Sequence, residues 1–221
     1  MMSILFCGAA TLPAEPDEPG PFERLFRAMR HAGKEPKHKS EHRNRHKQID
    51  EGENLRGTAG ALRLAVDREA LGERFLVLYG DSYLPTDFRA VWARFLSSGK
   101  PALMTVYKNA GRWDASNVVF AEGELKLYDK FASPGQRKQM EYIDYGLSAF
   151  TSACLRQHVP AGATLDLAEV FKRLSERGEL AAYEVFARFY EIGSPAGLEE
   201  FRRFMRAIAG GSVDAPERPK G

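Results

Sequence analysis

The chain has 221 residues, of which 43% are hydrophobic and 28% are charged, and its formal net charge is +2. This composition is ordinary for a soluble globular protein, and the length suits one domain with an extension. No run approaches the roughly 18 consecutive apolar residues of a membrane span, and Met1–Gly8 lacks the basic region of a signal peptide. Cys7 and Cys154 are too few and too far apart for a disulfide scaffold or a zinc knuckle, so we expect a cytoplasmic protein.

The composition changes abruptly near residue 50. The first 52 residues hold five of the twelve prolines and four of the five histidines, whereas all eight tyrosines lie at or after Tyr79. Residues 23–47 carry nine Lys or Arg and three Glu. Such a segment buries little apolar surface. We therefore expect residues 1–50 to be loosely structured apart from a short helix at 22–32, residues 51–209 to form the main domain, and residues 210–221 to be a flexible tail.

Beyond Asp50, apolar periodicity predicts alternating strands and helices. Strands are predicted at 75–79, 102–108, 117–120, 124–128, 142–150 and 183–192. Helices are predicted at 62–69, between Thr86 and Gly99, between Asp166 and Gly178, and at 195–209. The run 75–79 is apolar throughout, which is typical of a parallel strand buried on both faces. The alternation predicts an α/β protein with a layered sheet.

The segment Gly57-Thr58-Ala59-Gly60 is the first candidate for function. Small residues at the entry to a helix let the backbone approach a flat or anionic ligand, with free N–H groups directed at it. The alternative is an ordinary turn that leads into the helix.

Two acidic residues end predicted strands. Asp81 follows the apolar run 75–79, and Glu191 lies near the end of the run 183–192. Open α/β sheets bind ligands at such strand ends, and carboxylates there suit Mg²⁺ that bridges substrate phosphates. Two carboxylates from distant strands would then share one metal ion. The alternatives are an Asp that caps a turn and a Glu exposed to solvent.

Three further residues are candidates for binding a phosphorylated ligand. Lys130 follows the predicted strand 124–128 and suits a phosphate as a point charge. Asp144 suits sugar hydroxyl groups, and Gly146 leaves room for a ring beside it. The alternative is that the charged residues lie on the surface without a ligand.

Taken in chain order, these segments form a series. The series is Gly57-Thr58-Ala59-Gly60-Ala61-Leu62, Leu76-Val77-Leu78-Tyr79-Gly80-Asp81, Tyr128-Asp129-Lys130, Ile143-Asp144-Tyr145-Gly146 and Tyr190-Glu191-Ile192-Gly193-Ser194-Pro195. It resembles the sugar-phosphate nucleotidyltransferase family, above all the branch that acts on mannose- or heptose-1-phosphate with GTP. The resemblance covers Asp50 to Met205. It implies a Rossmann-like, three-layer α/β fold with a mixed sheet, and an enzyme that joins a sugar 1-phosphate to a nucleoside triphosphate with release of pyrophosphate.

The resemblance also implies roles for individual residues. The implied roles are contact with the base for Gly57, Thr58, Ala59 and Gly60, the first Mg²⁺ ligand for Asp81, the sugar phosphate for Lys130, and the sugar for Asp144 and Gly146. Glu191 stands where the family usually has its second metal-binding Asp. The Glu still supplies an oxygen ligand, on a longer side chain.

The N-terminus departs from the family. Its members open with a buried strand and a loop of the form Gly-Gly-x-x-Thr-Arg-Leu-x-Pro, which wraps the triphosphate. Ile4–Pro13 resembles this loop only faintly, and its arginine is absent. We therefore expect the N-terminal strands of the family to be missing or disturbed. We also expect weak or no turnover, since loss of one preorganised donor costs ~10²–10³ in rate and loss of a whole loop should cost more.

Three functions compete at this point: an active nucleotidyltransferase, a truncated and inactive remnant of one, and a nucleic-acid binder that uses the basic segment His31–Lys47. The third is the least favoured because no aromatic residue between Phe26 and Phe75 is available to stack on bases. We accordingly expect a nucleoside triphosphate and a sugar 1-phosphate as ligands, and neither a membrane nor nucleic acid.

Overall fold

The computed structural model describes residues 4–8, 49–109, 111–112 and 115–209. Contacts divide the chain into a unit of Met1–Ala9 with Ile49–Gly221 and a unit of Ala10–Gln48, and every element below belongs to the first unit. The expected helix at 22–32 and the expected tail at 210–221 lie outside the described residues. Within the described ranges, no helix has the length and apolar character needed to cross a membrane.

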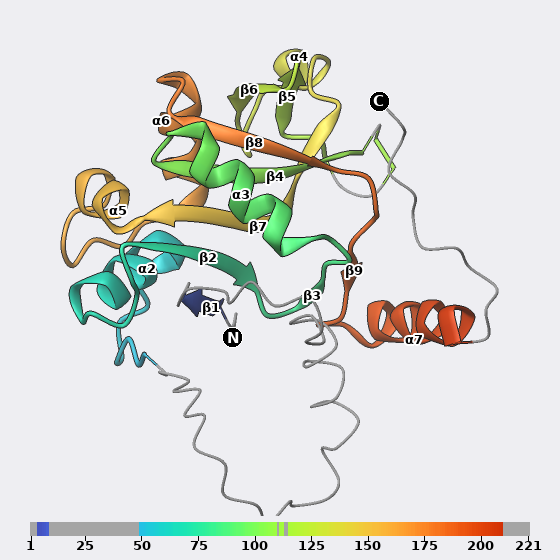
Figure 1. Cartoon of the computed structure of the whole chain (residues 1–221), viewed down its shortest axis with the longest axis horizontal. Helices are drawn as coiled ribbons and strands as arrows, with labels where there is room; N and C mark the ends of the chain where they lie inside the picture. Colours follow the sequence, from blue (N-terminus) through green and yellow to red (C-terminus); the bar gives the residue numbers. More distant parts are fainter. Residues whose placement is uncertain (1–3, 9–48, 110, 113–114, 210–221) are drawn as a thin grey trace, which may run out of the picture. The chain divides into compact units, whose positions relative to one another are not determined.

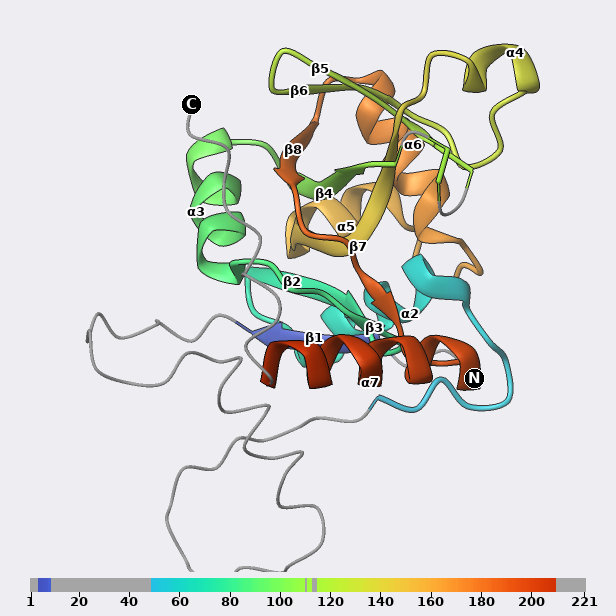
Figure 2. The same ribbon diagram turned by 90° about the vertical axis from the view of Figure 1, so that its right-hand side faces the viewer.

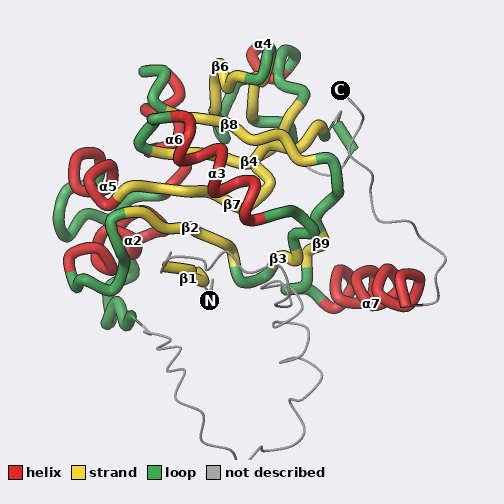
Figure 3. Tube along the Cα trace, in the orientation of Figure 1, coloured by secondary structure: helices red, strands yellow, loops and turns green. Residues whose placement is uncertain are grey.

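The elements alternate along the chain, as Figures 1 and 3 show. The helices are α2 (Gly57–Asp67), α3 (Phe88–Ser98), α4 (Pro134–Arg137), α5 (Ser152–His158), α6 (Leu167–Glu176) and α7 (Pro195–Ala209). The strands are β1 (Ile4–Gly8), β2 (Arg74–Tyr79), β3 (Ser82–Tyr83), β4 (Ala102–Lys108), β5 (Val118–Ala121), β6 (Glu124–Tyr128), β7 (Tyr142–Thr151), β8 (Leu180–Val185) and β9 (Tyr190–Glu191).

Seven of the described strands form one mixed sheet. Its order is β1-β2-β7-β4-β8, and the hairpin β5–β6 joins it where Val118 pairs with Tyr142. The pair β4–β8 is parallel, whereas β2 runs antiparallel to both β1 and β7. The expectation of a parallel strand before Asp81 is therefore wrong. The apolar run indicates that both faces of β2 are buried. It does not indicate whether the neighbouring strands run parallel or antiparallel to β2.

Helices cover both faces of this sheet. Phe75 and Val77 of β2 pack on one face with residues of α2, α5 and α6, whereas Leu76 and Leu78 pack on the other face against α3. Figure 2 shows α3 on one side of the sheet and α2, α5 and α6 on the other. The predicted three-layer α/β architecture with a mixed sheet is thus confirmed.

Two helix starts differ from the prediction. Asp87, rather than Thr86, caps α3, since its carboxylate accepts hydrogen bonds from the backbone amides of Arg89 (2.9 Å) and Ala90 (3.2 Å). A carboxylate at this position also interacts favourably with the positive end of the helix dipole. Helix α2 begins at Gly57 instead of Leu62, so the candidate Gly57–Gly60 segment forms its first turn. The predicted cap of α6 by Asp166 is confirmed.

The predicted strand 183–192 is two strands, β8 and β9, separated by residues 186–189. Side chains in this break make contacts of their own. The ring of Phe189 lies edge-on to that of Tyr145, with centroids 6.1 Å apart, and Arg188 forms an ion pair with Glu200 at 2.9 Å. Alternating apolar residues continue through the break, which is why the pattern predicted a single strand.

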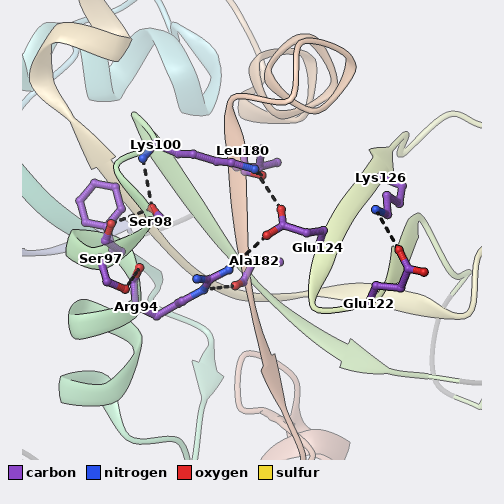
Figure 4. Close-up of polar contacts among 10 residues, drawn as sticks. Arg94, Ser97, Ser98, Lys100, Glu122, Glu124, Lys126, Leu180 and Ala182 are labelled. Atoms are coloured by element: carbon purple, nitrogen blue, oxygen red, sulfur yellow. Dashed lines mark hydrogen bonds and ion pairs between the residues drawn. The ribbon is translucent and has the colours of Figure 1, made fainter.

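The hairpin β5–β6 is tied to the rest of the sheet by charged groups, drawn in Figure 4. Glu124 forms ion pairs with Lys100 (3.1 Å) and Arg94 (3.5 Å). The same two cations donate to the backbone carbonyl oxygens of Leu180 and Ala182 in β8. The hydrogen bond and charge of Lys100 hold the pKa of Glu124 below its usual value. The network joins α3, β6 and β8 without using any candidate site residue.

Candidate active site

Asp81 and Glu191 lie on adjacent backbone segments. Asp81 connects β2 to β3, and Glu191 in β9 pairs with Ser82 in β3. The backbone N–H of Ile192 donates to the carbonyl oxygen of Asp81 at 2.7 Å. A Cβ atom at Gly193 would lie 2.8 Å from Glu191 Oε1 and 3.0 Å from Asp81 Cβ. The two acids therefore flank the same glycine, and their sharing of one metal ion stays a prediction.

The carboxylate of Glu191 also contacts the start of α7. Its Oε1 accepts a hydrogen bond from the Ser194 backbone N–H (2.8 Å), and its Oε2 accepts one from the Ser194 hydroxyl (2.5 Å). The Ser194 oxygen in turn accepts from the Gly197 N–H at 3.1 Å. Hydrogen bonds from the Ser194 hydroxyl and from the Gly193 and Ser194 amides hold the pKa of Glu191 below its usual value. Glu191 is therefore a charged acceptor at the helix start, rather than a side chain surrounded by solvent.

Tyr79 is the last residue of β2, and the charges of three acidic side chains act on its hydroxyl group. Burial raises the pKa of its hydroxyl, and the charges of Asp144, Asp166 and Asp81 raise it further. A Cβ atom at Gly146 would lie 3.6 Å from Tyr79 Cδ2. The candidate sugar-binding residues on β7 are thus brought to the end of β2, near Asp81.

Asp144 is partly buried in β7. Burial raises the pKa of its carboxyl to about 6, against the opposing effects of the Gly146 N–H and the charge of Lys130. The Gly146 N–H donates to Asp144 Oδ1 at 2.9 Å, and the Asp144 N–H donates to Asn117 Oδ1 at 3.1 Å. The carboxyl group is held in place, and it changes protonation state close to physiological pH.

Lys130 has a half-exposed side chain whose Nζ lies 4.0 Å from Asp166 Oδ2. The loop that carries it is fixed by its neighbours. Asp129 accepts hydrogen bonds from the Phe131 N–H (2.9 Å) and from Lys172 Nζ (2.7 Å), and Arg137 donates to the Lys130 carbonyl oxygen at 2.8 Å. Lys130 therefore combines a fixed backbone with an ammonium group that is accessible to an anion.

The Gly57–Gly60 segment packs against the loop before α6. The backbone amides of Ala59 and Gly60 donate to the Leu165 carbonyl oxygen at 2.9 and 3.3 Å, and a Cβ atom at Gly57 would lie 2.6 Å from that oxygen. The expectation that these amides are free for a ligand is therefore wrong for Ala59 and Gly60. Thr58 Oγ1 accepts from the Leu167 N–H at 2.7 Å. The small residues allow this close approach of α2 to the start of α6.

Asp81 and Glu191 fit a divalent cation that is shared with a substrate. Within the described ranges, no group of three or more His, Cys, Asp or Glu side chains is arranged to hold a metal ion. Mg²⁺ is usually bound through one or two carboxylates together with substrate phosphates and water, rather than by an all-protein cage. Glu191 Oε1 and Asp81 Cβ lie 2.8 and 3.0 Å from the Cβ position at Gly193, and the sharing of a cation by the two acids stays a prediction.

Two residues at the site were not predicted as functional. Tyr79 was treated only as part of a buried strand, although its ring lies beside Gly146, and Asp166 only as a helix cap, although its Oδ2 lies 4.0 Å from Lys130 Nζ. The available signal for Tyr79 was its place directly before Gly80-Asp81 in a strand that ends at the candidate site.

The fold is that of the sugar-phosphate nucleotidyltransferases. The inositol-1-phosphate CTP transferase from T. maritima matches with a TM-score of 0.52 at 21% identity, over 72% of this chain and 65% of that one. A Bacillus anthracis protein named as a glucose-1-phosphate thymidylyltransferase, in complex with a sucrose, matches with a TM-score of 0.53 at 17% identity, over 74% and 64%. HddC from Yersinia pseudotuberculosis matches with a TM-score of 0.48 at 17% identity, over 69% and 64%.

The resemblance inferred from the ordered motifs is thus confirmed for the fold. The chain covers less than two thirds of the length of these proteins. No protein-family model matches the chain, and no curated protein matches it.

Proposed function

We propose that the protein transfers a nucleotidyl group from a nucleoside triphosphate to a sugar 1-phosphate and releases pyrophosphate. The nucleotide we propose is GTP, and the sugar is mannose- or heptose-1-phosphate. The observation that carries the proposal is the meeting of Asp81 and Glu191 on either side of Gly193, in a chain with this fold.

The resemblance implies that the base contacts Gly57, Thr58, Ala59 and Gly60, but Ala59 and Gly60 are buried, so the base would contact only the surface that Gly57 and Thr58 leave exposed. Because the Ala59 and Gly60 amides are already bonded to Leu165, the base would meet the surface of this turn, and the remaining polar groups of Gly57 and Thr58 would orient it. The space beside Gly57 and Gly60 is occupied by the carbonyl oxygens of Leu165 and Ala163, so these glycines serve the packing of α2.

The sugar phosphate would bind between Lys130 and β7. The ammonium group of Lys130 would attract the phosphate, and its fixed loop would keep the attacking oxygen in place. Asp144 would contact sugar hydroxyl groups, with Gly146 leaving room for the ring. Its pKa of about 6 supports this role, because the carboxylate is an acceptor at neutral pH.

The reaction would join the sugar phosphate oxygen to the α-phosphorus of the triphosphate. The bond from that phosphorus to the bridging oxygen breaks, and the electron pair leaves with pyrophosphate. Asp81 and Glu191 would hold a Mg²⁺ ion, which when bound neutralises phosphate charge. Asp81 and Lys130 are the catalytic residues in this proposal. They contribute mainly by positioning the two anionic substrates for in-line attack.

The test is pyrophosphate release in a matrix of GTP, CTP, dTTP and UTP against mannose-, glucose- and heptose-1-phosphate, with Mg²⁺. We expect release with at least one pair, well below the ~1 s⁻¹ at the lower end of common enzyme turnover, and its loss in D81N. D87N is the matched control, because it makes the same change at an exposed helix cap where Asn serves as well as Asp. No release with any pair would refute the proposal and favour an inactive remnant, and release that D81N leaves intact would refute the catalytic role of Asp81.

A further inference from the structure

The Glu191 carboxylate bonds to the first turn of α7 through both of its oxygen atoms. Oε1 accepts from the Ser194 N–H and Oε2 from the Ser194 hydroxyl, which itself accepts from the Gly197 N–H. The N-terminus of an α-helix carries a positive partial charge of about +0.5 on its free amides. The carboxylate therefore compensates positive charge at the start of this helix.

The glycines around Ser194 make room for this contact. A Cβ atom at Gly197 would lie 2.5 Å from Glu191 Oε2, and one at Gly193 would lie 2.8 Å from Glu191 Oε1. Both distances are shorter than ordinary van der Waals contact, so larger residues would displace the carboxylate. The local sequence is thus suited to holding Glu191 against the helix start.

The rest of α7 is held to β3 and β9 by other contacts. The ring of Phe204 stacks on that of Tyr190, with centroids 4.3 Å apart. The ring centroid of Phe201 lies 4.5 Å from that of Tyr83. Arg188 donates to both carboxylate oxygens of Glu200, at 2.9 and 3.1 Å. The helix does not depend on Glu191 for docking as a whole. The dependence is confined to its first turn.

We propose that the first turn of α7 and a divalent cation at Asp81 compete for the Glu191 carboxylate. The proposal rests on the metal role assigned above to these two acids. A cation beside Glu191 Oε1 adds positive charge next to the positive end of the helix, so each weakens the other's hold on the carboxylate. Because binding couplings are reciprocal, a weaker cap gives tighter metal binding by the same factor that metal loosens the cap.

The first measurement is binding of Mn²⁺ alone to the full chain, followed by electron paramagnetic resonance of the free ion. S194A removes the hydroxyl donor, and we expect it to bind Mn²⁺ about two- to five-fold more tightly than the wild type. S133A, which removes the same group from the cap of α4, is the matched control and leaves the affinity unchanged. D81N abolishes binding.

The second measurement is hydrogen exchange of the Gly197 amide with and without Mg²⁺. We expect Mg²⁺ to speed exchange about two- to five-fold in the wild type and to have no effect in D81N, and E191Q to exchange fast under both conditions. A cap with a purely structural role gives no dependence on Mg²⁺. The competition is refuted if S194A leaves Mn²⁺ affinity unchanged or lowers it, and if Mg²⁺ does not change the exchange rate. That result does not contradict the metal role of Asp81 and Glu191. Absence of any D81N-sensitive Mn²⁺ binding removes both.

Discussion

Asp81 and Ile192 are joined by a backbone hydrogen bond of 2.7 Å, from the Ile192 N–H to the Asp81 carbonyl oxygen. The bond continues the short ladder between β3 and β9 and connects the two segments that carry the acidic pair. Because only backbone atoms take part, changes to the side chains of Asp81 or Glu191 leave this bond available. Variants at Asp81 therefore test chemistry more directly than they test folding, whereas variants at Glu191 also change the cap of α7.

Gly193 separates the two acids, and replacing it tests their proximity. We expect G193A to lower pyrophosphate release at least ten-fold, because the new methyl group would lie 2.8 Å from Glu191 Oε1 and 3.0 Å from Asp81 Cβ and push the side chains apart. The matched control is G135A, where a Cβ atom meets nothing within 4 Å. Activity of G193A equal to that of G135A would show that the spacing of the acids does not matter.

Gly57 combines a left-handed backbone with close contact. We expect G57A to lower the free energy of unfolding by more than G99A does, measured by urea denaturation. Both glycines have a positive φ (+67° and +65°), which costs an alanine about 1–2 kcal/mol. Only at Gly57 would the Cβ also meet the Leu165 carbonyl oxygen, at 2.6 Å. Equal losses in the two variants would mean that the approach of α2 to Leu165 adds nothing to stability.

Local sequence was enough to locate most of the elements around the site. The apolar run before Gly80-Asp81 is β2, and the apolar face after Ser194-Pro195 is α7, because burial and helix capping act over a few neighbouring residues. The approach of Asp81 and Glu191 to one glycine depends on the pairing of β3 with β9, and their role as a metal-binding pair stays a prediction. The family resemblance supplied the order in which such segments recur.

Other features depend on partners far away in the sequence. The antiparallel ladders of β2 involve β1 and β7, and the amides of Ala59 and Gly60 are satisfied by Leu165, more than a hundred positions further on. The cap that Glu191 provides for α7 depends on the longer side chain of Glu in place of Asp, and on space at Gly197. Neither periodicity nor a motif contains these contacts.

Thr58 belongs to the candidate nucleotide-binding turn, yet it also supports α6. Its hydroxyl oxygen accepts from the Leu167 N–H at 2.7 Å and lies 3.5 Å from Asp166 Oδ1. We expect T58V to lower the unfolding free energy by about 0.5–2 kcal/mol, the usual cost of losing a helix-capping oxygen, and T58S to stay close to the wild type. Denaturant titration of the three proteins measures this. A T58V protein as stable as T58S would contradict the capping role.

Lys130 is proposed to hold the sugar phosphate. We expect K130M to weaken binding of mannose-1-phosphate at least ten-fold by calorimetric titration, because the ammonium group provides a charge-assisted contact to the anion. K126M is the matched control on the preceding strand, where Lys126 forms an ion pair with the exposed Glu122 at 3.6 Å. If both variants bind equally well, the sugar phosphate lies elsewhere.

Asp144 should make stability depend on pH. Burial raises the pKa of its carboxyl from 3.8 to about 6, so between these values the folded state holds a proton that the unfolded state releases. The associated stability is present in full below pH 4 and is lost as the pH rises through 6. We expect the wild type to lose about 1 kcal/mol of unfolding free energy between pH 5 and 7 relative to D144N.

Asn keeps the Oδ1 acceptor for the Gly146 N–H, and D67N, on the exposed face of α2, is the matched control. The difference between wild type and D144N cancels titration elsewhere, including that of His158, whose pKa is lowered by burial. A difference that stays constant from pH 5 to 7 would show that Asp144 remains ionised throughout.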